Sequence, residues 1–148
     1  MIRVQREPID VGAELAALTA GRTDIGALAS FVGLVRDIVS ERITAMTLEH
    51  YPGMTEKKLA EIEAEANARW PLQASLIVHR YGRMLPGEPI VLVATAAEHR
   101  AAALEACAFL IDWLKTEAPF WKLEETADAS RWVEARSADD EAAARWRR

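Results

Sequence analysis

Hydrophobic and polar positions along the chain follow two periods, one typical of helices and one typical of strands. Apolar residues that recur every three or four positions predict a helix, whereas apolar runs or alternation between turn residues predict a strand. The predicted strands are Ile2–Val4, Ile25–Val35, Ile43–His50, Ala74–Tyr81, Pro89–Ala96, Phe120–Glu125 and Arg131–Ala135. The predicted helices are Asp10–Ala20, Thr55–Trp70, Glu98–Glu117 and a C-terminal helix that starts at Ser137.

Capping and breaking residues define the ends of these helices. Asp10 and Thr55 carry side-chain oxygens that can accept hydrogen bonds from the first helical amide groups. Gly21 can end the first helix, because glycine readily adopts the left-handed conformation found there. Pro71 and Pro119 end the second and third helices, since proline interrupts the hydrogen-bond ladder.

The order of the elements predicts the fold class. The segment Ile25–Val35 is apolar and rich in small residues, which is typical of a buried strand, and a polar turn separates it from Ile43–His50. Strands joined by a short polar turn favour antiparallel pairing. Mixed helices and adjacent strand pairs predict an α+β fold with mostly antiparallel sheet. At 148 residues, the chain has the length of one domain, residues 1–148.

Composition and charge narrow the possible function. Hydrophobic residues make up 51% and charged residues 28%, an ordinary globular balance. No apolar run approaches the roughly 20 residues of a membrane span, and the N-terminus lacks a signal-peptide core, so we expect a cytoplasmic protein. The net charge of -5 argues against a surface built for nucleic acid. Any bound anion must therefore be held by a local cluster of cations.

Metal and cofactor chemistry find little support in the sequence. Cys107 is the one cysteine, and its row of apolar helix neighbours predicts a buried structural thiol. That row is Leu104, Cys107, Ile111 and Leu114. The histidines at 50, 79 and 99 lie on different predicted elements without ligand spacing, and no nucleotide-binding glycine loop occurs. We therefore expect neither a metal nor a cofactor.

Two lysines on either side of Pro119 are the strongest candidates for chemistry. Lys115 falls at the end of the third helix and Lys122 on the strand that follows, so the turn can bring them together. Nearby aromatic residues would partly desolvate their ammonium groups. Those residues are Trp113, Phe120 and Trp121. The alternatives are a helix C-terminal cation for Lys115 and an ordinary edge-strand lysine for Lys122.

Three further cations could bind an anion. Arg36 follows the strand that ends in Gly33-Leu34-Val35, and His99 and Arg100 open a helix directly after a strand. A continuous helix rises about 1.5 Å per residue, so Arg100 and Lys115 lie roughly 22 Å apart. They cannot share a compact pocket in one chain. Either there are two anion sites, or a second subunit in a two-fold dimer completes the pocket, which is the arrangement we favour.

Several longer stretches occur in one order along the chain. They are FVGLVRD at 31–37, LEHYPGMTEKKL at 48–59, RWP at 69–71, HRYGRMLPGE at 79–88, EHRAAALEA at 98–106, DWLKTEAPFWK at 112–122 and RWVEA at 131–135. Together they resemble the catalytic (large) subunit of molybdopterin synthase. The resemblance implies an α/β-hammerhead type of fold and an enzyme of molybdenum-cofactor biosynthesis. Such an enzyme converts cyclic pyranopterin monophosphate into molybdopterin.

The same resemblance implies partners and site residues. The sulfur donor would be the C-terminal glycine thiocarboxylate of a small ubiquitin-like subunit, in a heterotetramer built on a central homodimer of this chain. Lys115 and Lys122 would be catalytic, with Lys115 polarising the reacting centre or assisting proton transfer, and a covalent role for it stays open. The substrate-binding set would be Leu34, Val35, Arg36, His99, Arg100, Lys115, Lys122, Leu123 and Glu124. The alternative function is a non-catalytic dimeric docking module for a sulfur-carrier protein.

Overall fold

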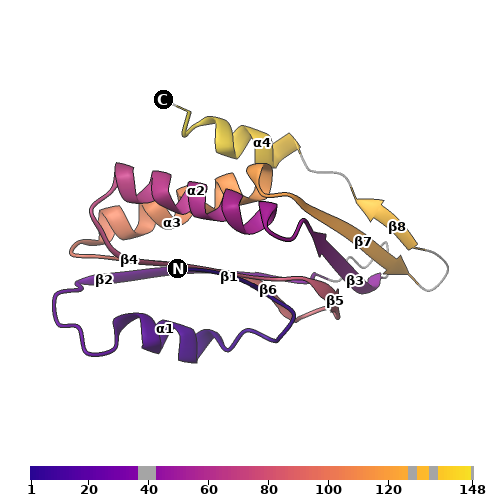
Figure 1. Cartoon of the computed structure of the whole chain (residues 1–148), viewed down its shortest axis with the longest axis horizontal. Helices are drawn as coiled ribbons and strands as arrows, with labels where there is room; N and C mark the ends of the chain where they lie inside the picture. The colour runs from indigo at the N-terminus through magenta and orange to yellow at the C-terminus, as the bar shows by residue number, and fades with distance from the viewer. Residues whose placement is uncertain (37–42, 127–129, 134–136, 148) are drawn as a thin grey trace.

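The computed structural model describes residues 1–36, 43–126, 130–133 and 137–147. It contains two four-stranded sheets, with helices on both faces of the first (Figure 1). The strands are β1 (Ile2–Gln5), β2 (Ala27–Leu34), β3 (Ile43–His50), β4 (Leu72–Arg80), β5 (Gly82–Met84), β6 (Pro89–Ala97), β7 (Phe120–Thr126) and β8 (Ser130–Val133). The helices are α1 (Val11–Thr19), α2 (Met54–Arg69), α3 (Arg100–Glu117) and α4 (Ser137–Ala144). This arrangement confirms the predicted α+β class with mostly antiparallel strands.

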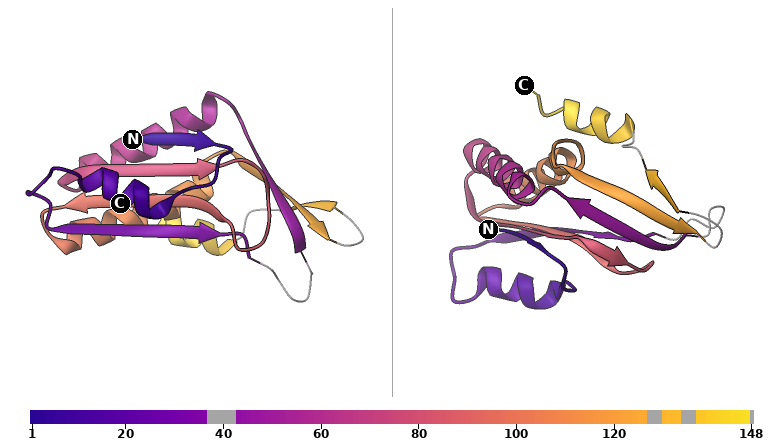
Figure 2. Two further views of the ribbon diagram at one scale, coloured as in Figure 1. Left: turned by 90° about the horizontal axis from the view of Figure 1, so that it is seen from below. Right: turned by 45° about the vertical axis from the view of Figure 1, so that its right-hand side comes forward.

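The first sheet has the strand order β1-β4-β6-β2, and only its β1–β4 pair is parallel among the described strands (Figure 2). Its central strands are apolar on both faces, because α2 and α3 cover one face and α1 covers the other. Ile77 and Val93 pack in the cluster under α2 and α3, whereas Val78 and Leu92 pack in the cluster with α1. The alternation of side chains along each strand thus supplies two cores.

The second sheet has the order β5-β3-β7-β8 and extends to one side of the helical layer (Figure 2). Strand β7 pairs with both β3 and β8 in antiparallel register. The predicted final strand pair is confirmed as far as Val133; the end of the predicted strand, Ala135, lies outside the described residues. The short strand β5 was not predicted, because three residues are too few to show a period.

The predicted pairing of Ile25–Val35 with Ile43–His50 is wrong. Within the described residues β2 pairs with β6 alone, whereas β3 belongs to the other sheet. Strand β2 is also an edge strand rather than a buried one, with Leu28 40% and Leu34 54% exposed. Its neighbour β6 is apolar except for the buried Thr95 and takes a central place, between β4 and β2.

The start of α2 differs from the predicted cap at Thr55. The N-cap is Gly53, with a φ of 86°, and the Glu56 side chain accepts a hydrogen bond from its amide. The Thr55 hydroxyl instead accepts from the Tyr51 amide at 2.9 Å and donates to the Pro119 carbonyl at 3.1 Å. Thr55 is therefore buried and joins the start of α2 to the turn between α3 and β7.

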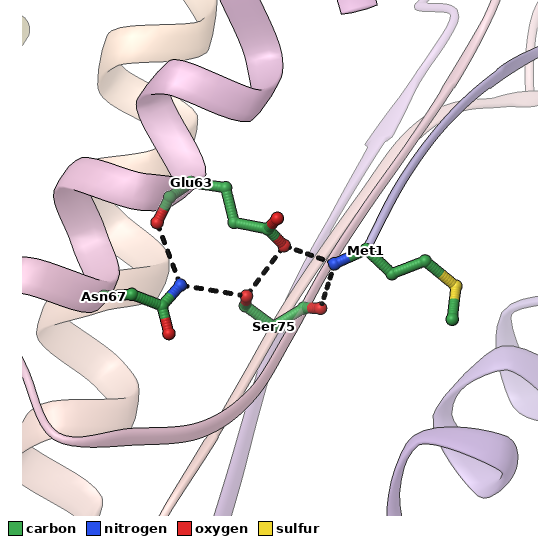
Figure 3. Close-up of polar contacts among 4 residues, drawn as sticks. All are labelled: Met1, Glu63, Asn67 and Ser75. Atoms are coloured by element: carbon green, nitrogen blue, oxygen red, sulfur yellow. Dashed lines mark hydrogen bonds and ion pairs between the residues drawn. The ribbon is translucent and has the colours of Figure 1, made fainter.

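Polar contacts fasten the other half of α2 to the first sheet (Figure 3). Glu63 accepts hydrogen bonds from the N-terminal ammonium group of Met1 and, at 2.7 Å, from the Ser75 hydroxyl. The Asn67 side chain donates to the same hydroxyl oxygen at 3.3 Å. These contacts join α2 to β4 and to the residue that precedes β1, so the helical layer is held over the sheet at a fixed position.

Helix α3 differs from its predicted apolar row at one residue. Cys107 and Leu114 are buried, but Leu104 is 59% exposed, and the neighbouring Ala103 and Ala106 are buried instead. Burial raises the pKa of the Cys107 thiol to about 11, which agrees with the predicted structural role. None of the helices in the described part of the chain is long and apolar enough to cross a membrane.

Candidate functional site

A cavity of about 680 Å³ lies between the two sheets, beside the last turn of α3. Its walls come from β2, β4 and β6 of the first sheet and from β3 and β7 of the second. Three of the predicted cations, Arg36, Lys115 and Lys122, line it. Residues that are far apart in the sequence thus line one cavity, and the two lysines are both among them.

Each cation is placed by a different element. Lys115 lies in the last turn of α3, directly after buried Leu114. Lys122 lies on β7, opposite Leu48 of β3. Arg36 follows β2, whose end is held by a hydrogen bond of 2.9 Å from the Val35 amide to the Glu88 carbonyl. The turn between β5 and β6 therefore helps to position the start of the Arg36 segment.

Strand geometry decides which of the uncharged and acidic residues in the predicted substrate-binding set line the cavity. Leu34, Val35 and Glu124 line the cavity, and Glu124 is almost fully buried. Leu123 is not among the lining residues. Successive side chains on a strand point to opposite faces, so Leu123 points away when Lys122 and Glu124 point inward.

The expected enclosure of the lysines by three aromatic residues is wrong for two of them. Phe120 lines the cavity. Trp113 instead lies under the Arg69 guanidinium, at 5.4 Å from its ring centroid, and Trp121 packs on Tyr51 at 5.7 Å between ring centroids. At about 100° per residue, Trp113 and Lys115 point to nearly opposite sides of α3. Lys115 is exposed accordingly.

His99 and Arg100 lie at the far end of α3, outside the cavity. The helix runs without interruption from Arg100 to Glu117, so Arg100 and Lys115 lie at its opposite ends, as predicted. Arg100 lines a separate hollow of about 180 Å³ together with Ala27–Ala29 of β2, and His99 is exposed. The structure therefore brings six of the nine predicted residues together and leaves these two, with Leu123, apart from them.

His79 is a cavity residue that the sequence analysis did not select. It lies on β4 and is 5% exposed, with its ring stacked on Phe120 at 3.8 Å between centroids. Burial lowers the pKa of His79 from 6.5 to about 3, against a hydrogen bond to Arg80 that raises it. The charges of Lys115 and Lys122 lower it further. A histidine within the apolar strand Leu72–Arg80 was the signal that could have identified it.

The buried imidazole predicts a specific loss of stability in acid. Between pH 6.5 and about 3 the unfolded chain binds a proton at His79 that the folded chain does not, since the folded pKa is about 3. The free energy of unfolding should therefore fall, as pH decreases through this window, by up to about 1.4 kcal/mol per pH unit. Urea unfolding between pH 7 and 4 should show a shallower slope for His79→Gln. Equal slopes would show that His79 does not contribute.

The side chains of the cavity suit an anionic small molecule. Arg36, Lys115 and Lys122 supply hydrogen-bond donors with positive charge, which phosphate and carboxylate-like groups accept. The volume lies in the range of about 300–1,000 Å³ typical of small-molecule sites. In the described part of the chain no group of three His, Cys, Asp or Glu side chains could hold a metal ion.

Comparisons with known proteins agree along nearly the whole chain. A family model described as MoaE protein matches residues 4–117. The molybdopterin synthase catalytic subunit of Pseudomonas aeruginosa is 57% identical over 146 residues, which cover 98% of this chain and 97% of that one. The MoaE protein from Burkholderia ambifaria superposes with a TM-score of 0.85 at 58% identity, over 99% of this chain and 97% of the other. A complex of subunits 1 and 2 of the molybdopterin-converting factor from Helicobacter pylori contains the same fold, with a TM-score of 0.78 at 22% identity over 92% of each chain.

Proposed function

This chain belongs to the MoaE protein family, whose relatives are molybdopterin synthase catalytic subunits, and on that basis we propose its reaction, site and assembly. The substrate is cyclic pyranopterin monophosphate and the product is molybdopterin. Each of the two dithiolene sulfurs comes from the C-terminal glycine thiocarboxylate of a separate small ubiquitin-like partner molecule in the cytoplasm. In each transfer the sulfur forms a bond to a substrate carbon, and water then cleaves its bond to the glycine carbonyl, which leaves the partner with an ordinary carboxylate. The observation that carries the proposal is the convergence of Arg36, Lys115 and Lys122 on one cavity.

The cations divide the chemistry between binding and activation. Arg36 and Lys122 hold the phosphate and other negative charge of the substrate through charge-assisted hydrogen bonds. We assign to Lys115, in the last turn of α3, the polarisation of the reacting centre as the thiocarboxylate sulfur attacks. Negative charge develops on the substrate during such an attack, and a fixed cation stabilises it without reorganisation. Both lysines are therefore assigned as catalytic, and Leu34, Val35 and Glu124 as walls of the binding site.

Among the described strands β2 pairs with β6 alone, and its other edge supports a dimer that completes the pocket. If two β2 edges pair antiparallel across a two-fold axis, the Arg36 end of one strand meets the Ala27 end of the other. That end lies beside the start of the partner's α3, since the Gly26 amide donates to the Ala97 carbonyl at 3.1 Å. His99 and Arg100 of a second copy would then approach the cavity.

Exposed apolar side chains make this edge suitable for burial. They follow β2 and the adjacent face of α3, and an exposed apolar patch of this kind marks an interaction site. They are Leu28 and Leu104, which also line the small hollow beside Arg100, and Phe31 and Leu34, which also line the large cavity. We assign this edge to a central homodimer, with one small subunit on each chain, which gives a heterotetramer.

Incubation with substrate and partner tests the function. Wild-type protein, cyclic pyranopterin monophosphate and thiocarboxylated small subunit should yield the dithiolene product by mass spectrometry, whereas partner with an ordinary C-terminal carboxylate should yield none. Binding of the small subunit without any product would support a docking module instead. The carboxylate partner is the matched control, because it preserves docking and removes the transferable sulfur.

A further inference from the structure

One side chain in the cavity differs from all other polar residues that line it. Arg36, Lys115 and Lys122 are positively charged donors, and Glu124 and Asp139 are acidic. Among the lining residues that the structure describes, His79 alone has an uncharged side chain with a hydrogen-bonding nitrogen or oxygen. The neutral imidazole of His79 therefore offers a ligand a different kind of hydrogen bond from that of the cations, which suit a phosphate.

Its tautomer is set by the main chain. The Nδ1 atom lies 2.9 Å from the Arg80 carbonyl oxygen, and a carbonyl can only accept a hydrogen bond, so Nδ1 carries the proton. The other ring nitrogen, Nε2, therefore has a free lone pair and is an acceptor. The ring is also stacked on Phe120 with an interplanar angle of 17°. This stacking and the hydrogen bond to the Arg80 carbonyl restrict the position and orientation of the ring.

Proton transfer is an unsuitable role for this imidazole. With a pKa of about 3, His79 is too weak a base to remove a proton efficiently near neutral pH. Protonation would also add a charge facing Lys115 on α3, Lys122 on β7 and His50 on β3, all of which oppose it. The lone pair of Nε2 can instead accept a hydrogen bond from a donor that enters the cavity.

We propose that Nε2 of His79 accepts a hydrogen bond from an N–H group of the pterin ring and so orients the heterocycle, while the cations bind its phosphate. The inference rests on the proposed function, because it takes the ligand to be a pterin. A pterin ring offers N–H donors, whereas inorganic phosphate is bound through its acceptor oxygens. His79 therefore contributes to recognition of the ring and not to recognition of the phosphate.

Two variants of His79 separate the two ring nitrogens. His79→Asn keeps an amide N–H where Nδ1 donates to the Arg80 carbonyl but does not reach the place of Nε2. His79→Gln reaches that place with an acceptor and gives up the contact with the carbonyl. Binding of 2-amino-4-oxopteridine, a pterin without phosphate, should weaken about tenfold in His79→Asn and recover in His79→Gln. Binding of inorganic phosphate should stay within about twofold in both.

Several results would overturn the inference. Wild-type pterin affinity in a folded His79→Asn variant would do so, as would equal weakening of pterin and phosphate. If the variants do not fold, the Nε2 nitrogen resonance of wild type decides, since it should shift with pterin and stay unchanged with phosphate. Failure of the proposed function is distinguishable, because it would appear as absence of dithiolene product from wild type whatever the His79 variants bind.

Discussion

Replacing Lys115 with alanine should lower turnover about a hundred- to a thousandfold, the loss expected when a fixed donor to developing charge is removed. The substituted side chain lies in the last turn of α3 and is exposed, so its removal leaves no cavity in the core. Single-turnover kinetics, with the enzyme and thiocarboxylated partner in excess over the pterin substrate, measures the effect on the chemical step. The protein should still form a dimer in solution, as measured by the mass of the assembly, because Lys115 is not part of the β2 edge.

Lys58→Ala is the matched control for that loss. Lys58 lies on α2 and pairs with Glu61 at 3.6 Å and with Glu117 at 3.9 Å, outside the cavity lining. Surface pairs of this type contribute at most about 1 kcal/mol to stability, so turnover should stay within about twofold. Near-normal turnover of Lys115→Ala would remove Lys115 from the catalytic residues, and the same loss in both variants would indicate a general effect of lysine removal.

Local pattern predicted the elements well because their causes are local. Apolar runs identified the central strands β4 and β6, and Pro71 and Pro119 marked the ends of two helices. The continuity of α3 was also a local property, and it was enough to separate Arg100 from Lys115. The rise per residue of an unbroken helix fixes the distance between two of its residues, so the separation of Arg100 from Lys115 could be predicted without tertiary information.

The pairing of β2 could not be predicted in the same way, because it depends on contacts between segments that are distant in the sequence. The sequence of β2 is as apolar as that of a central strand, yet β2 is an edge strand, and Leu28, Phe31 and Leu34 stay exposed. His79 was missed for a related reason. Its role depends on Phe120 and on the lysines of α3 and β7, and no spacing in the sequence joins those residues.

Mixing two inactive variants should restore activity if the pocket is shared between subunits. In a dimer of one Arg100→Ala chain and one Lys115→Ala chain, the first chain keeps its Lys115 and receives an intact Arg100 from its partner. The other pocket lacks both side chains. Random exchange makes about half of the dimers mixed, so recovery should approach about a quarter of wild-type turnover. The recovery is measured as turnover after the subunits have exchanged, and native mass spectrometry verifies that exchange.

A second mixture distinguishes a shared pocket from a nonspecific gain. His99 and Arg100 are adjacent at the start of α3 and belong to the same half of the proposed pocket. In a mixed dimer of His99→Ala and Arg100→Ala chains, every pocket therefore lacks one of these two side chains, and turnover should not rise above the average of the separate variants. Recovery in this second mixture, or none in the first after complete exchange, would contradict a pocket completed by the partner chain. Because Arg100 lies at the opposite end of an uninterrupted helix from Lys115, a single-chain pocket cannot explain recovery confined to the first mixture.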